Sequence, residues 1–379
     1  MRKVLFSASI LSHIKAFHVP YLAFFKENGF EVHVAARNNL GSEWRFTDYI
    51  EEFFDIDVDR APFRFGNVRA LWELKAIIAE NDYALIHCHT PVAGVLTRLA
   101  ARRARKKGTK VVYTAHGFHF YKGAPFINWL LFYPVERIAS RWTDCLVTIN
   151  REDYELALKR GFKARRIVCI PGVGVDLTRF SPADSSTISK RRAEYGYNDD
   201  DFLLLYAAEM NRNKHQDLLI RSMVEIARKV PSARLLLAGR GPLREEYQRL
   251  ASELNVSGYI DFLGYREDMH RIFPMCDVIV ASSYREGLPV NIMEAMACAK
   301  PIVATRNRGH SELVLPGQNG FLVEPHDPAS FAECVLRLYE DPELRAEMGR
   351  RSYEFVERFS LSNVYPRMAG LYKKILNLN

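Results

Sequence analysis

The stretch Val278–Ala297 reads VIVASSYREGLPVNIMEAMA and decides the fold. It opens on four apolar residues, Val278 to Ala281, which are typical of a strand buried on both faces. Gly287 and Pro289 follow, and proline is favoured in the first turn of a helix. Good helix formers come next. The stretch therefore predicts a strand, a turn and a helix, which is the repeating unit of a parallel α/β sheet.

The same alternation extends in both directions from this stretch. A first series of short apolar, β-branched runs predicts strands at 4–9, 32–36, 53–58, 85–89, 111–116, 145–149 and 167–170. A second series predicts strands at 202–207, 234–238, 259–263, 278–281 and 302–304. Helix-length segments separate the runs, so we expect two doubly wound, Rossmann-like α/β domains.

The boundary between the two series is expected at Pro171-Gly172-Val173-Gly174-Val175, where glycine and proline cluster. We predict an N-terminal domain over 1–170, joined by a C-terminal helix over 360–379, and a second domain over 171–359. A length of 379 residues suits two such domains.

Composition excludes several classes of protein. Hydrophobic residues make up 48% of the chain and charged residues 26%, the balance of an ordinary globular protein. No apolar run approaches the roughly 20 residues of a membrane-spanning helix. The six cysteines are widely spaced without a Cys-x-x-Cys pair, which argues against a disulfide framework or a zinc site. We expect a cytoplasmic protein.

Positive charge is concentrated in the first half of the chain. Residues 1–175 hold 26 Lys and Arg against 17 Asp and Glu, whereas residues 176–379 hold 27 against 28. The basic segment includes Arg102, Arg103, Lys106 and Lys107. Such a field attracts anionic lipid, pyrophosphate or nucleic acid, although a solvated helix end without a partner has the same pattern.

Two glutamates flank the predicted helix start in the second domain. Free backbone N–H groups and the helix dipole make such an N-terminus a phosphate site. Glu286 precedes the helix, Glu294 lies inside it, and seven residues separate them. The two carboxylates can therefore serve different parts of one ligand, with sugar hydroxyls near Glu286 and ribose hydroxyls near Glu294.

This arrangement resembles the family 4 retaining glycosyltransferases of GT-B fold, whose signature is Glu-x7-Glu in the second domain. Further segments that resemble the family are 171–176, 238–243, 300–305 and 317–323. The resemblance implies two Rossmann-like domains that face each other across a cleft. It also implies an enzyme without a metal or cofactor, whose donor substrate is a nucleoside-diphosphate sugar.

The resemblance also implies roles for individual residues. Glu286 would be a catalytic residue that contacts the donor sugar. The donor-binding residues would be Arg212, Lys214, Gly287, Leu288, Pro289, Val290 and Glu294. Lys214 would neutralise the leaving diphosphate. Glu209 stands where the family has arginine, and Arg212 is expected to supply the missing guanidinium.

Histidines follow two strands of the first domain. By resemblance, His116 would position the substrate as a third catalytic residue. His87-Cys88-His89 is a weak metal motif, because alternation along a strand sends Cys88 to the opposite face. We therefore expect no metal ion there.

Aromatic residues follow the basic segment, among them Phe118 and Trp129. Cations next to aromatic rings suit a protein on an anionic bilayer, although packing of an amphipathic helix in the core is an alternative. We assign Arg102, Arg103, Lys106, Lys107, Phe118 and Trp129 to an acceptor or membrane side. The segment resembles family members that build bacterial polysaccharides and lipid-linked oligosaccharides.

The sequence thus predicts a peripheral enzyme on the inner face of the cell membrane. It would transfer a hexose or N-acetylhexosamine from a UDP-sugar to a glycan acceptor, with lipid-linked acceptors expected. Two alternatives stay open. One is a sugar-nucleotide epimerase or phosphorylase of the same fold; the other is a basic nucleic-acid-binding protein, for which no recognition motif is present.

Overall fold

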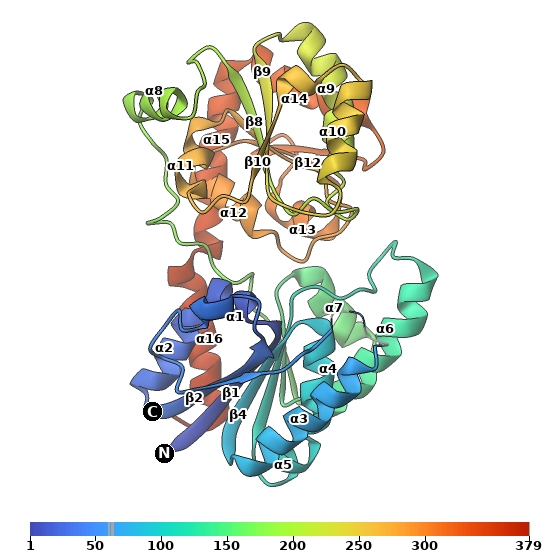
Figure 1. Ribbon diagram of the computed structural model, residues 1–379, viewed down its shortest axis with the longest axis vertical. Helices are drawn as coiled ribbons and strands as arrows, with labels where there is room; N and C mark the ends of the chain where they lie inside the picture. Colours follow the sequence, from blue (N-terminus) through green and yellow to red (C-terminus); the bar gives the residue numbers. More distant parts are fainter. Residues whose placement is uncertain (60, 62–63, 379) are drawn as a thin grey trace. The chain divides into compact units, whose positions relative to one another are not determined.

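The computed structural model describes residues 1–59, 61 and 64–378, which divide into two compact units (Figure 1). Unit 1 contains Met1–Val173 and the C-terminal segment from Val364, and unit 2 contains Gly174–Asn363. The boundaries expected from the sequence were residues 170 and 359.

Unit 1 is built on a parallel sheet with strand order β3-β2-β1-β4-β5-β6-β7. Its strands are β1 (Arg2–Ile10), β2 (Phe30–Arg37), β3 (Glu52–Asp55), β4 (Tyr83–His89), β5 (Lys110–Ala115), β6 (Cys145–Thr148) and β7 (Arg166–Cys169). Its helices are α1 (Leu11–Phe17), α2 (Val19–Glu27), α3 (Gly66–Glu80), α4 (Pro91–Ala100), α5 (Arg102–Lys106), α6 (Phe126–Ala139), α7 (Arg151–Lys159) and α16 (Leu361–Leu376). Short 3-10 helices cover Gly41–Trp44 and Ser140–Trp142.

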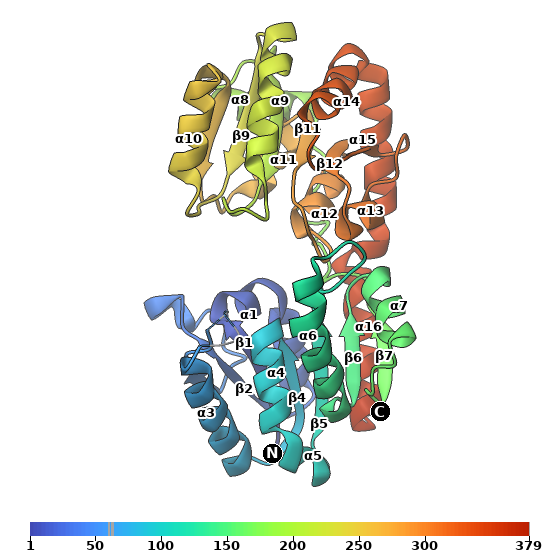
Figure 2. The ribbon, with the colours of Figure 1, turned by 90° about the vertical axis from the view of Figure 1, so that its right-hand side faces the viewer.

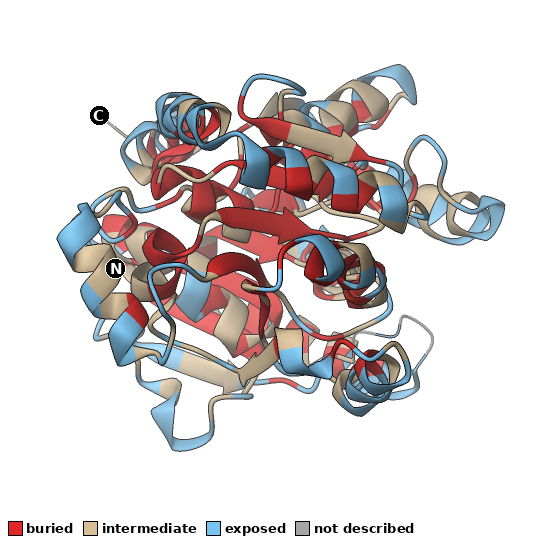
Figure 3. Cartoon of the chain, turned by 90° about the horizontal axis from the view of Figure 1, so that it is seen from above, coloured by how far each residue is buried: buried red, intermediate tan, exposed pale blue. Residues whose placement is uncertain are grey.

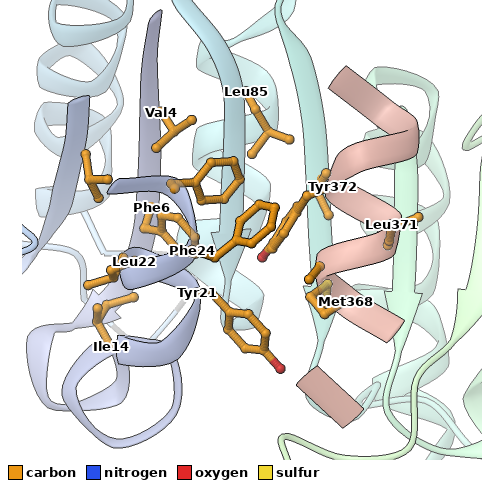
Figure 4. Close-up of a cluster of buried hydrophobic side chains, with 14 of the residues drawn as sticks. Val4, Phe6, Ile14, Tyr21, Leu22, Phe24, Leu85, Met368, Leu371 and Tyr372 are labelled. Atoms are coloured by element: carbon orange, nitrogen blue, oxygen red, sulfur yellow. The ribbon is translucent and has the colours of Figure 1, made fainter. Parts of the chain in front are cut away.

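Helices cover both faces of this sheet because successive side chains of a strand point to opposite faces. Val4 and Phe6 of β1 pack with α1, α2 and α16, whereas Leu5 packs with α3 and α4. Figure 4 shows Tyr372 of α16 directed at the aromatic side chains of α2. The last helix of the chain is therefore part of the unit 1 core (Figure 2).

Unit 2 has a parallel sheet with strand order β10-β9-β8-β11-β12-β13. Its strands are β8 (Phe202–Ala207), β9 (Ala233–Ala238), β10 (Ile260–Gly264), β11 (Val278–Ala281), β12 (Ile302–Thr305) and β13 (Gly320–Val323). Its helices are α8 (Ser185–Glu194), α9 (Gln216–Lys229), α10 (Arg244–Glu253), α11 (Met269–Met275), α12 (Val290–Ala297), α13 (Arg308–Leu313), α14 (Pro328–Glu340) and α15 (Pro342–Val356). Short 3-10 helices cover Ser257–Tyr259 and Glu357–Phe359.

In both units the central strands are buried and the helices expose their outer faces (Figure 3). Strand order reverses between β1 and β4 in unit 1 and between β8 and β11 in unit 2. Ligands of open α/β sheets bind at the carboxyl edge beside such a switch point. These two edges are therefore where functional side chains are expected.

The strand predictions need two corrections. β13 (Gly320–Val323) was not among the predicted strands; it pairs with β12, and an added Cβ on Gly320 would lie only 2.0 Å from the Ile302 carbonyl oxygen. β3 ends at Asp55, three residues earlier than predicted. Ile56 and Val58 beyond it are nevertheless buried, so their apolar character extended the predicted strand.

Candidate functional site

The loop that follows β11 at the switch point of unit 2 is held by hydrogen bonds from both neighbouring strand ends. The Ser282 hydroxyl donates to the Lys214 carbonyl oxygen at 2.7 Å, and the Tyr284 amide donates to the Asn213 carbonyl oxygen at 2.8 Å. On the other side, the Thr305 hydroxyl donates to the Ser283 carbonyl oxygen at 2.7 Å. The loop is therefore fixed before any ligand arrives.

Lys214, on the turn after β8, forms an ion pair with Glu286 of this loop. The Lys214 ammonium lies 2.5 Å from Oε1 of Glu286, and the Ser283 hydroxyl donates to the same oxygen at 2.6 Å. The Tyr206 hydroxyl is bonded to that of Ser283 at 2.6 Å. Ser283 and Tyr206 were missed in the sequence because neither has a distinctive spacing to Glu286.

The pair stabilises charge in both partners. Burial by itself raises the pKa of Glu286, but the Lys214 ammonium outweighs burial, and the pKa lies below its ordinary value. Burial likewise lowers the pKa of Lys214, and the Glu286 carboxylate reverses this shift and raises the pKa. Both side chains are thus charged at neutral pH.

The backbone of Glu286 is positioned from α13. The Arg308 guanidinium donates to the Glu286 carbonyl oxygen at 3.0 Å. A Cβ added at Gly309 would lie 2.7 Å from Cβ of Glu286 and 2.9 Å from the Gly287 carbonyl oxygen. Close packing therefore requires glycine at position 309. Through this contact, α13 fixes the position of Glu286 and Gly287.

Helix α12 begins directly after this loop, as predicted. Its N-cap residue is Pro289, and no side chain of the described residues caps its first turn. Leu288 and Pro289 are buried, whereas Gly287 and Val290 are half-buried. The first amides of a helix lack intrahelical partners, so this end can bind an anion.

The remaining donor-side residues differ in their surroundings. Burial raises the pKa of Glu294, inside α12, to about 7. Arg212 and Glu209 are exposed on the turn after β8 that also carries Lys214. The structure thus brings Lys214 and Glu286 into contact, whereas Arg212 is exposed on the same turn as Lys214.

A cluster of histidines lies at the carboxyl edge of the unit 1 sheet. Nε2 of His116 is 3.3 Å from Nε2 of His13 and 3.4 Å from Nδ1 of His89. Nε2 of His18 is 3.3 Å from Nε2 of His13. Burial lowers the pKa of His116 to about 4, and it lowers the pKa values of His18 and His89 well below their ordinary range.

The predicted membrane side needs a correction at Phe118. This side chain is 2% exposed and packs with Phe120 and Phe162, so the prediction that its ring lies on a surface is wrong. Trp129 is half-buried against the same cluster. Both rings belong to the core beneath α6.

The outer face of α6 is apolar instead. Phe126 is 80% exposed and Leu130 57%. The exposed apolar side chains of the helix are Phe126, Ile127, Leu130, Leu131, Val135 and Ile138. Their spacing of three to four residues forms one stripe along the helix.

The predicted cations adjoin the end of this helix. Arg102, Arg103 and Lys106 of α5 and Lys107 directly after it are exposed. The Arg102 guanidinium lies 4.5 Å from the ring centre of Trp142, and Arg105 is paired with Asp144 at 2.9 Å. In the described part of the chain, no helix combines the length and apolarity needed to span a bilayer.

Comparisons with known proteins identify the family. The model described as Glycosyltransferase Family 4 matches residues 22–179, and the model described as Glycosyl transferases group 1 matches residues 187–355. The chain is 44% identical over 378 residues to the protein named "Putative glycosyltransferase EpsD" of Bacillus subtilis (strain 168), covering 100% of this chain and 98% of that one.

A more distant relative is UDP-Gal:alpha-D-GlcNAc-diphosphoundecaprenol alpha-1,3-galactosyltransferase of Escherichia coli. It is 26% identical over 334 residues, covering 86% of this chain and 85% of the relative. Among solved structures, Anabaena Alr3699/HepE in complex with UDP and glucose matches with a TM-score of 0.80 at 21% identity. That match covers 99% of this chain and 100% of the other.

The structural likeness agrees with the two parallel α/β sheets, and the sequence identity to EpsD extends through the whole chain. The family assignment favours glycosyl transfer over epimerisation, phosphorolysis and nucleic-acid binding. The chain belongs to the family 4 glycosyltransferases and has the GT-B fold.

Proposed function

We propose that this enzyme transfers a hexose or N-acetylhexosamine from a UDP-sugar to a lipid-linked glycan, with retention of anomeric configuration, in the synthesis of a bacterial polysaccharide. The observation that carries the proposal is the Lys214–Glu286 pair beside the N-terminus of α12. UDP and undecaprenyl diphosphate in the name of the E. coli relative support the donor and acceptor classes.

The donor would bind along the first turn of α12. Its pyrophosphate would accept hydrogen bonds from backbone amides near Gly287, Leu288 and Val290, where the helix dipole favours negative charge. Glu294, further along the helix, would accept hydrogen bonds from the ribose hydroxyls. The pKa of Glu294 is about 7, so a fraction of these side chains still carries a proton at neutral pH. Glu294 must lose that proton before it can accept as a carboxylate.

In the chemical step, the bond from the anomeric carbon to the diphosphate oxygen breaks. A bond from that carbon to the acceptor oxygen forms on the same face. The acceptor hydroxyl passes its proton to the leaving phosphate. Glu286, held as a carboxylate, would stabilise positive charge on the sugar in the transition state.

Lys214 and Arg212 would neutralise the departing diphosphate in place of a divalent cation. Lys214 is already preorganised by its contact with Glu286, and preorganised charge is usually the largest catalytic contribution. Arg212 is exposed and can move toward the phosphate. We therefore propose that the donor site works without a metal ion or cofactor.

Unit 1 would rest on the cytoplasmic face of the membrane. The apolar stripe of α6, from Phe126 to Ile138, can enter the boundary between headgroups and acyl chains. The exposed cations of α5 at the end of the stripe would attract anionic lipid headgroups. A lipid-linked acceptor would then reach the enzyme from the membrane surface, and His116 would position substrate.

The direct test is product formation from a panel of UDP-hexoses and UDP-N-acetylhexosamines with a short-chain lipid diphosphate sugar as acceptor. We expect one UDP-sugar to give a new glycolipid with the α or β configuration of its donor, as read by proton NMR. Conversion of the UDP-sugar without an acceptor, or transfer with inversion, would contradict the proposal.

A further inference from the structure

The histidine cluster of unit 1 collects four imidazoles from four chain segments. His13 lies in α1, His18 lies between α1 and α2, His89 ends β4, and His116 follows β5. Strands β1 and β4 are the neighbours at which strand order reverses. One potential ligand atom from each histidine lies within 4.8 Å of the others. The cluster therefore occupies the edge where open α/β sheets bind ligands.

Three of the six nitrogen separations match those of a tetrahedral metal site. Zn–N bonds of about 2.0–2.1 Å place the ligand nitrogens of a regular tetrahedron about 3.3–3.4 Å apart. The contacts of His13 with His18 and His116 both measure 3.3 Å, and that of His116 with His89 measures 3.4 Å. These three pairs of rings thus approach one another as closely as ligands of a common ion do, and all four ligand atoms lie within 4.8 Å of one another.

Hydrogen bonds alone do not account for these contacts. An imidazole nitrogen carries either one proton or one lone pair, so it makes one good hydrogen bond. Nε2 of His13 is in contact with both His18 and His116, and Nε2 of His116 is in contact with both His13 and His89. Hydrogen bonds can therefore satisfy two of the three contacts, whereas a cation uses the lone pair of every nitrogen.

Two of the four rings are buried in the protein. His18 and His89 are 3% and 0% exposed, and their remaining nitrogens, Nδ1 and Nε2, have no hydrogen-bond partner among the described residues. These are not the nitrogens that make the contacts above, so each would need a further partner, such as a water molecule, beside the ion.

A neighbouring histidine shows the contrast. His87 is as buried as His89, but its Nδ1 is bonded to the Tyr372 hydroxyl at 2.7 Å and its Nε2 to the Thr114 hydroxyl at 2.8 Å. Both of its nitrogens are satisfied by protein groups. His87 is therefore a structural residue and not part of the cluster.

We propose that Nε2 of His13, His18 and His116 and Nδ1 of His89 bind one transition-metal ion, with Zn²⁺ as the expected occupant. Imidazole ligands suit Zn²⁺, and four protein ligands are typical of a structural site. The ion would fasten α1 to the ends of β4 and β5. His13 and His116 are half-buried, which leaves a route for entry.

The metal site takes all four ligands from unit 1, whereas Lys214 and Glu286 belong to unit 2. It does bear on His116. With Nε2 bound to the ion, only Nδ1 of that ring would remain to position a substrate.

The test uses the full-length protein without a polyhistidine tag and without nucleotide. After removal of metal with a chelator, Co²⁺ is titrated to follow the visible bands of tetrahedral cobalt, and Zn²⁺ affinity is measured by competition with a chromophoric chelator. The variants are His13→Ala and His116→Ala, with His326→Ala of unit 2 as a matched control. Circular dichroism of each metal-free variant checks that it folds.

We expect one ion per chain, tetrahedral cobalt bands, and a rise in Tm with Zn²⁺ that His326→Ala retains. His13→Ala and His116→Ala should each weaken affinity by at least about tenfold. A wild-type protein that neither binds Co²⁺ nor gains thermal stability from Zn²⁺ would overturn the proposal. So would unchanged affinity in both folded variants, since the metal would then lie elsewhere.

Discussion

The ammonium nitrogen of Lys214 lies 2.5 Å from Oε1 of Glu286, although 72 positions separate the two residues in the chain. Parallel strands β8 and β11 are neighbours in the sheet, and the turns that follow them meet at its carboxyl edge. The contact keeps a carboxylate ionised in a buried position and holds a cation ready beside it. Both charges are needed by the proposed transfer step.

Lys214→Met should lower kcat by about 10²- to 10³-fold, because preorganised charge on the leaving diphosphate is lost. It should also raise the pKa of Glu286, since burial remains while the ammonium that lowers this pKa is gone. The acid limb of the rate profile should then move to higher pH. Lys190→Met, at an exposed position of α8, is the control and should leave kcat and the profile unchanged. Equal kcat in the two variants would remove Lys214 from the mechanism.

Glu294→Gln should stabilise the ligand-free protein at pH 8 by up to about 3 kcal/mol. The pKa of Glu294 is raised by burial to about 7, so the folded state favours the neutral form. Its favourable contribution is present below about pH 4.5 and is lost as pH rises to about 7. The gain in Tm should therefore shrink at pH 4.5. The control is Glu245→Gln, at an exposed position of α10, whose Tm relative to the wild type should not depend on pH in this way. If the change in Tm followed pH in the same way in both variants, burial of Glu294 would be refuted.

Gly309→Ala should reduce kcat/KM by at least about tenfold, because small displacements of reacting groups are costly. The added Cβ would come within 2.7 Å of Cβ of Glu286, so the loop after β11 must move. Gly258→Ala is the matched control, since a Cβ there meets nothing within 4 Å. Steady-state kinetics of the two variants should differ although both fold. Wild-type kinetics in Gly309→Ala would show that the position of this loop does not limit catalysis.

Membrane binding should depend on both parts of the proposed surface. Phe126→Ser with Leu130→Ser should reduce flotation with anionic vesicles, and so should neutralisation of Arg102, Arg103, Lys106 and Lys107. High salt should weaken the contribution of the cations more than that of the stripe. Val224→Ser, at an exposed apolar position of unit 2, is the control. Equal recovery of all variants with neutral and anionic vesicles would exclude this surface.

Much of the fold follows from local patterns. Runs such as Val278–Ala281 are short, apolar and bounded by turn residues, and the structure confirms most of the predicted strands at their positions. Strand β13 was not predicted because it has only four residues, Gly320–Val323, and begins with a glycine. Phe118 was misplaced because buried and exposed aromatic residues follow each other closely between residues 118 and 126, so the sequence could not tell which rings face the core.

The site was only partly predictable for a different reason. Glu286, Glu294 and Lys214 stand out through their spacing and resemblance to a family. Arg308, Gly309 and Ser283 support the same loop through contacts that depend on strand order. The histidine cluster is formed by residues up to 103 positions apart, as in the contact of His13 with His116. Such sets become visible only when the topology is known.

The most direct test of the central claim is the Tm of the wild type and Glu294→Ala with UDP, GDP or ADP, each compared with ligand-free protein in the same EDTA buffer. EDTA then removes any metal ion of unit 1 equally from the samples with and without nucleotide. We predict that UDP at about 100 times its Kd stabilises the wild type by about 2.7 kcal/mol. GDP and ADP should stabilise it less, and UDP should not stabilise Glu294→Ala. No stabilisation by any nucleotide at millimolar concentration would contradict a donor site at the N-terminus of α12.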